Sequence, residues 1–79
     1  MCRVPADQPP WISDALRTLG ARIQAQRLHK NLTQEKLAER AGVDRSTVQR
    51  IEGGYTDPKF SHLLRIAEAL DMPLAQLTR

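Results

Sequence analysis

The sequence has few of the residues that build disulfide-linked, metal-bound or membrane-spanning proteins. Its single cysteine, Cys2, excludes an intramolecular disulfide. That cysteine together with His29 and His62 provides too few ligands for a closed structural zinc site. Apolar runs are no longer than two or three residues, whereas a membrane helix needs about 20. We therefore expect no metal, no cofactor and no membrane partner.

The short length argues against an enzyme. The chain has 79 residues and a mass of 8.9 kDa, which is enough for one domain with a thin core. A substrate pocket would use up most of that core. The sequence also shows no paired carboxylates, no nucleophile–histidine spacing and no glycine-rich phosphate loop. Because the first thirteen residues lack an apolar signal segment, the expected location is the cytoplasm.

Positive charge is concentrated in the middle of the sequence. The net charge is +3 and the isoelectric point is about 9.6. Residues 17–50 carry eight basic and three acidic side chains, whereas each flanking segment has a net charge of −1. This distribution is typical of a protein that binds a polyanion, with nucleic acid favoured over a membrane. A solvated basic surface accounts for the charge equally well.

The periodicity of apolar residues predicts an all-α fold, a compact bundle of about five short helices. Residues 1–10 contain three prolines and are expected to form a flexible arm, which leaves residues 11–79 as the folded domain. No alternation of apolar and polar residues indicates a strand. Two stripes at helical spacing define the first and fourth helices: Ile12, Leu16, Leu19, Ile23 and Arg27, then Phe60, Leu63, Ile66, Ala67 and Leu70. Pro73 is expected to open a last turn, with Leu74 and Leu77 facing inward.

Two short helices are predicted between these stripes. Thr33 is a good N-cap for a helix that Gly42 ends, and Asn31 with Leu32 marks the break before it. Asp44 is expected to cap the next helix, which covers residues 45–52 and stops at Gly53 and Gly54. Val43 is expected to fill the space between the two helices. A helix, a glycine turn and a second capped helix form the helix-turn-helix arrangement.

The second of these helices has one apolar face and one polar face. Val48 and Ile51 lie on one arc, and the opposite arc carries Arg45, Ser46, Gln49 and Arg50. Arginine, glutamine and serine are residue types that read base edges in the major groove of DNA. They are also common on ordinary solvated helix surfaces, so the face alone leaves both interpretations open.

Residues 32–54, LTQEKLAERAGVDRSTVQRIEGG, resemble the phage-repressor and Cro-like helix-turn-helix family, also called the xenobiotic-response-element (XRE) type. Asp57-Pro58 and the apolar residues of the fourth helix match its continuation, so the similarity covers roughly residues 16–77. The resemblance implies a lambda-repressor-like DNA-binding domain whose third helix enters the major groove of double-stranded DNA. Gly53 departs from the family pattern, because many members carry Asn, Arg or Lys there.

The resemblance also implies roles for individual residues. Gln34 matches a family glutamine that contacts a phosphate and braces the recognition helix. The loop after that helix matches a segment that clamps the DNA backbone. The implied base-reading residues are Arg45, Ser46, Thr47, Gln49 and Arg50, and the implied backbone contacts are Gln34, Gly54, Tyr55 and Lys59.

Arg27 and Glu52 are charged residues on otherwise buried arcs, so they must be paired or reach solvent. The two satisfy each other if the first helix crosses the third, and the family has an Arg–Glu ion pair at these positions. We therefore expect a structural pair, with a phosphate contact by Arg27 as the alternative. Trp11 and Ile12 are expected in the core, with a contact between two chains as the alternative, and Leu74 and Leu77 present the same choice. For Arg22, Lys30 and Lys36, a solvated position is favoured over a phosphate contact.

The sequence thus predicts a sequence-specific DNA-binding transcriptional repressor, which is expected to associate with the nucleoid through its binding to DNA. A homodimer on an inverted repeat is expected, since one recognition helix reads few bases. The alternative is an antitoxin or adaptor that uses the same fold to bind a protein partner. No apolar residue lies on the free arc of the third helix, which counts against that alternative.

Overall fold

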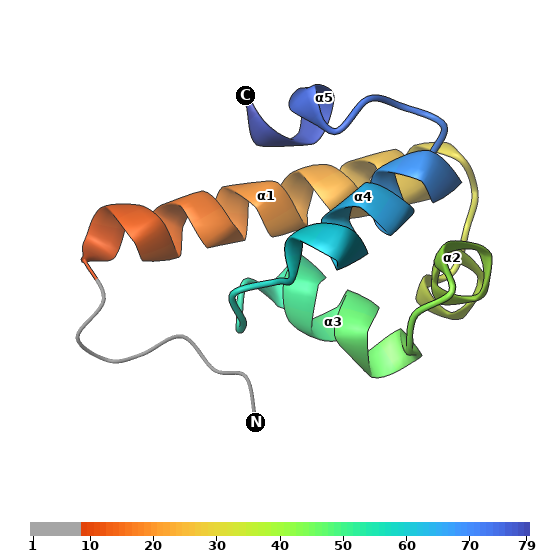
Figure 1. Ribbon diagram of the computed structural model, residues 1–79, viewed down its shortest axis with the longest axis horizontal. Helices are drawn as coiled ribbons and strands as arrows, with labels where there is room; N and C mark the ends of the chain where they lie inside the picture. Colours follow the sequence, from red (N-terminus) through yellow and green to blue (C-terminus); the bar gives the residue numbers. More distant parts are fainter. Residues whose placement is uncertain (1–8) are drawn as a thin grey trace.

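The computed structural model describes residues 9–79, and this part of the chain is entirely helical (Figure 1). Its five helices are α1 (Pro10–His29), α2 (Gln34–Ala41), α3 (Arg45–Gly53), α4 (Phe60–Ala69) and α5 (Ala75–Thr78). The predicted all-α class is confirmed, and no described residue lies in a strand. The predicted arm falls almost wholly outside the described residues, except that Pro10 already belongs to the first turn of α1.

The helices pack around the long α1. Helix α3 packs on α1, α2 packs on both α3 and α4, and α5 returns to α1. Figure 1 shows α1 along the length of the molecule, with α5 on one side and α3 on the other. The short α2 and α3 therefore form one end of the bundle, supported by α1 and α4.

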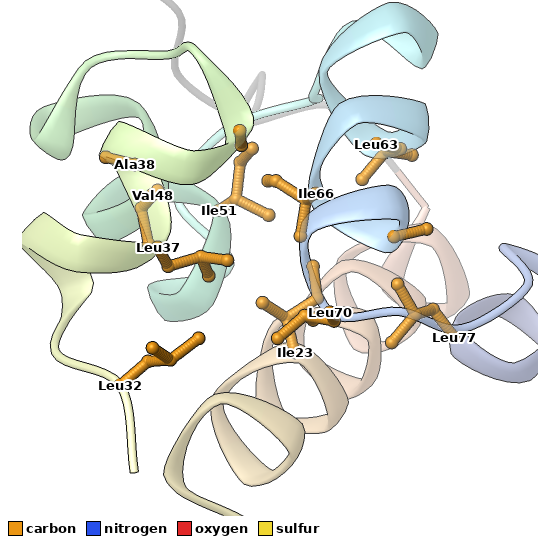
Figure 2. Packing of buried hydrophobic residues seen from close by; sticks show 12 residues of the cluster. Ile23, Leu32, Leu37, Ala38, Val48, Ile51, Leu63, Ile66, Leu70 and Leu77 are labelled. Carbon is orange, nitrogen blue, oxygen red and sulfur yellow. The ribbon is translucent and has the colours of Figure 1, made fainter. Parts of the chain in front are cut away.

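One apolar core joins all five helices (Figure 2). Ile23 of α1, Leu37 of α2, Val48 of α3 and Ile66 of α4 are completely buried, and Leu77 of α5 is 1% exposed. Ile23 and Ile66 lie on the predicted stripes, Val48 lies on the predicted apolar arc of its helix, and Leu77 faces inward as expected. Val43, in the α2–α3 turn, packs against this core while remaining half-buried.

The first four helices end with the same hydrogen-bond pattern. At α2, the Val43 amide donates to the Ala38 carbonyl oxygen at 3.0 Å, and the Gly42 amide donates to that of Glu39 at 3.4 Å. This is the Schellman motif, which needs a left-handed residue just beyond the helix. The residues in that conformation are Asn31, Gly42, Gly54 and Asp71. The sequence predicts the first three of these endings but not the one at Asp71.

The structure corrects three predictions about helix ends. Trp11 is 71% exposed and not in the core, because the first turn of α1 extends beyond the helices that cover the rest of it (Figure 1). Phe60 is 65% exposed, since it is the first residue of α4 and lies at the margin of the buried arc.

The third correction concerns helix capping. Asp44 occupies the N-cap position of α3, but its side chain makes no capping hydrogen bond. Thr33 does cap α2, accepting a hydrogen bond from the Lys36 amide at 3.0 Å.

Candidate nucleic-acid interface

Helix α3 presents one polar face to solvent. Arg45, Ser46 and Gln49 are exposed, and Thr47 and Arg50 are half-buried at the edges of that face. The reverse of the helix is buried through Val48, Ile51 and Glu52. Three of the candidate base-reading residues are thus exposed to solvent, and the other two are partly exposed.

A buried network fixes the end of α3. Arg27 Nε donates to Glu52 Oε2 at 2.7 Å, and Arg27 Nη2 donates to Glu52 Oε1 at 3.1 Å. The two side chains are only 9% and 3% exposed. A bidentate arginine–carboxylate pair has a well-defined geometry, so it holds α1 and α3 in one register.

Two further hydrogen bonds extend this network to the start of α2. Arg27 Nη1 donates to the Leu32 carbonyl oxygen at 2.8 Å. Gln34 Nε2 donates to Glu52 Oε1 at 3.0 Å. The side chain of Gln34 therefore braces α3 through Glu52 while remaining half-buried at the first turn of α2. The buried charges of Arg27 and Glu52 satisfy each other, which removes the need for a phosphate contact by Arg27.

The loop between α3 and α4 starts in contact with α1. Gly54 has a φ of 72°, and a Cβ there would lie 2.8 Å from Arg17 Cγ and 3.0 Å from Arg17 Cα. Tyr55 follows it, 67% exposed, with its amide bonded to the Arg50 carbonyl oxygen at 3.0 Å. Lys59 is also exposed, just before α4. The backbone of this segment is therefore held by α1 and α3, while the side chains of Tyr55 and Lys59 face solvent and that of Thr56 is buried.

Residues from α3 and this loop meet around one small hollow of about 70 Å³. Thr47 and Arg50 line it from α3, and Lys59 lines it from the loop. His62, half-buried in the first turn of α4, also lines it, although the sequence gives no reason to place it there. The structure thus brings candidate base-reading and backbone-contacting residues to one surface.

The basic side chains differ in their partners. Arg22 donates to the carbonyl oxygens of Leu77 and Arg79, so it is engaged with the C-terminal turn and is not simply solvated. Lys36 pairs with Glu39 at 3.0 Å. Among residues 9–79, no ion pair involves the candidate residues Arg45, Arg50 or Lys59. Their charges are not neutralised by a described carboxylate.

Sequence reasoning missed one residue that sets the position of α3. Gly20 is buried in α1, and a Cβ at this position would lie 2.8 Å from the Glu52 carbonyl carbon and closer still to the carbonyl oxygens of Ile51 and Glu52. The two helix backbones touch there. A glycine inside an otherwise regular helix was the available signal.

Within the described residues there is no group of three histidine, cysteine, aspartate or glutamate side chains that would hold a metal ion. No helix of residues 9–79 is long and apolar enough to cross a membrane.

Comparison with known proteins assigns the family. The helix-turn-helix family profile matches residues 23–77, so the chain belongs to the helix-turn-helix family, of the XRE type. The immunity repressor protein of Bacillus phage phi105 is 38% identical over 60 residues, which cover 76% of this chain and 42% of the repressor. The chain therefore spans less than half the length of that relative.

Two solved structures share the fold. The restriction-modification controller protein C.AhdI from Aeromonas hydrophila is 35% identical, with a TM-score of 0.77 over 82% of this chain and 97% of that chain. The biofilm regulator SinR of Bacillus subtilis, solved in complex with DNA, is 32% identical, with a TM-score of 0.72 over 77% of this chain and 98% of that chain. The family and these neighbours are those of DNA-binding transcription regulators and not of enzymes.

Proposed function

We propose that this protein is a sequence-specific regulator of transcription that acts as a repressor by occupying a promoter on double-stranded DNA. The observation that carries the proposal is the polar face of α3, with exposed Arg45, Ser46 and Gln49 opposite the buried Val48 and Ile51. An α-helix with such a face fits the major groove. Support also comes from the similarity to SinR, which has been solved with DNA.

Base reading is assigned to the polar face and its edges. Arginine makes bidentate hydrogen bonds to guanine, and glutamine makes them to adenine. We assign Arg45 and Arg50 to the first kind of contact and Gln49 to the second, with Ser46 and Thr47 as shorter-range contacts. The network around Glu52 keeps α3 in place, so these side chains act from a rigid helix.

Backbone contacts are assigned to the two segments on either side of α3 in the chain. Gln34 lies at the start of α2, whose N-terminal turn has amides suited to a phosphate. Gly54, Tyr55 and Lys59 lie in the loop after α3. Such contacts fix the position of the protein on the duplex without reading its sequence.

A homodimer on an inverted repeat is part of the same proposal. One recognition helix reads only a few base pairs, and two helices about 34 Å apart read two half-sites one helical turn apart. This arrangement supplies the specificity that a regulator needs among competing genomic sites.

Selection from a randomised duplex library at near-physiological salt tests the function. Recovery of a two-fold symmetric motif supports a dimeric, sequence-specific regulator and gives the half-site spacing directly. Binding without sequence enrichment, lost steeply as salt is raised, would limit the interaction to phosphate contacts. Absence of binding would overturn the proposal and direct the search to a protein partner.

A further inference from the structure

Gly53, the last residue of α3, has no conformational reason to be glycine. The described glycines with positive φ are Gly42 and Gly54, so the backbone of Gly53 is one that other residues adopt readily. A glycine in a helix is less favourable than alanine because it loses more backbone entropy on folding. What distinguishes glycine from other residues at this position is therefore the space that its missing side chain leaves.

The aromatic ring of Tyr55 occupies that space. A Cβ on Gly53 would lie 2.7 Å from Tyr55 Cδ2 and 2.9 Å from Tyr55 Cζ, and closer still to Cε2. Side-chain contacts this short do not occur, so the ring lies against the last turn of α3 only because residue 53 has no side chain. The Tyr55 amide is also bonded to the Arg50 carbonyl oxygen at 3.0 Å.

The ring lies against α3 but is not buried. Tyr55 is 67% exposed even though both its backbone and its ring contact α3. Burial of the ring therefore contributes little to the core. An exposed phenol next to the recognition helix is suited to donate a hydrogen bond to a phosphate oxygen, a contact that tyrosine makes in protein–DNA complexes.

Gly53 differs from Gly20 in what a side chain would meet. At Gly20 the obstacle is the backbone of α3, which cannot move without separating two helices. At Gly53 the obstacle is a surface side chain that can rotate away. Alanine at position 53 should therefore displace the ring of Tyr55 and leave the fold intact.

We propose that Gly53 is a positioning residue for DNA binding: its missing side chain seats the Tyr55 ring against the end of α3, where the phenol hydroxyl donates to a phosphate of the DNA backbone. This inference rests on the proposed function. It also gives a physical reason for glycine at a position where many family members carry Asn, Arg or Lys. The contact would come from Tyr55, two residues later in the chain.

The test compares Gly53→Ala, Tyr55→Phe and the double variant by fluorescence anisotropy, using a labelled duplex recovered by library selection or, if no motif emerges, the random duplex pool. Tyr55→Phe should weaken binding by about tenfold or more, since a hydrogen bond to a charged group is lost. Gly53→Ala should weaken it by a similar factor. The double variant should bind no more weakly than either single variant, because both changes remove the same contact.

One control variant and two further measurements separate this role from a structural one. Leu28→Ala truncates an exposed apolar side chain of α1 and should bind as the wild type does. The slope of log affinity against log salt should be unchanged in Tyr55→Phe and Gly53→Ala, since neither removes a charge. The chain has one tyrosine, so carbon-13 labelling of tyrosine gives a single set of ring signals in NMR spectra. Those signals should move in free Gly53→Ala while the unfolding midpoint does not fall.

The outcomes distinguish this inference from the proposed function. If the wild type binds no DNA, the proposed function fails. If the wild type binds DNA and Tyr55→Phe binds equally well, the inference is overturned and the function stands. Losses that multiply in the double variant would also overturn it, because they would place the two residues in separate contacts. Tyr55→Phe alone decides the phosphate contact if Gly53→Ala fails to fold.

Discussion

Gly20 of α1 lies directly against the peptide group of Glu52 in the last turn of α3. A Cβ at Gly20 would lie 2.8 Å from the Glu52 carbonyl carbon. The close approach of the two backbones brings the Glu52 carboxylate to Arg27, two turns further along α1. The position of the proposed recognition helix therefore depends on a glycine that is not part of the DNA-binding surface.

Gly20→Ala should destabilise the protein by about 2–3 kcal/mol, because the added methyl group must push two helix backbones apart. Urea unfolding followed by circular dichroism measures this change. Gly53→Ala is the matched control, since it also adds a methyl group to a helical glycine but meets only a movable side chain. Equal stability of Gly20→Ala and the wild type would show that the backbones do not approach this closely.

Glu52→Ala should cost about 3–5 kcal/mol, because it leaves the buried guanidinium of Arg27 without its partner. Thermal unfolding gives the loss of stability. The control is Glu39→Ala, which breaks the exposed pair with Lys36 and should change stability by no more than about 1 kcal/mol. Similar small effects for both variants would mean that the Arg27–Glu52 pair does not hold α1 and α3 together.

Much of this architecture follows from local rules that the sequence displays. The cap at Thr33 and the stop at Gly42 depend on residues within one or two turns, and the structure contains both. The predicted stripes are buried at Ile23 and Arg27 and from Leu63 to Leu70, but not at Phe60. The free face of α3 follows from the same periodicity.

The errors concern relations between distant segments. Phe60 has the right spacing for burial and Trp11 is next to a stripe residue, but whether a helix end is covered depends on the lengths of its neighbours. The contact of Gly20 with α3 and that of Tyr55 with Gly53 depend on how backbones and side chains approach in three dimensions. Periodicity along one helix carries no information about such contacts.

Gln34→Ala should weaken DNA binding by a similar factor on every sequence, because Gln34 is assigned to the backbone and to bracing α3. Its effect on stability should be about 1 kcal/mol, the value of one hydrogen bond. Competition binding with matched and mismatched duplexes measures the effect on specificity, and Gln24→Ala on the exposed side of α1 is the control. A loss confined to some sequences would assign Gln34 to base reading.

Lys59→Ala should weaken the salt dependence of DNA binding. The slope of log affinity against log salt concentration should become shallower by about one, as expected for the loss of one phosphate contact. Binding titrations over a range of salt concentrations give the slope. Lys36→Ala removes a lysine that is already paired with Glu39 and should leave the slope close to that of the wild type. An unchanged slope in Lys59→Ala would remove Lys59 from the interface.

The central claim is that α3 reads bases while its flanking segments hold the DNA backbone. The most direct test is to repeat the library selection with Arg45→Ala and compare the recovered motif with that of the wild type. The account predicts lost preference at one base pair of each half-site, a change of about 1–3 kcal/mol there, with the other positions retained. Equal weakening of every sequence, with an unchanged motif, would contradict it.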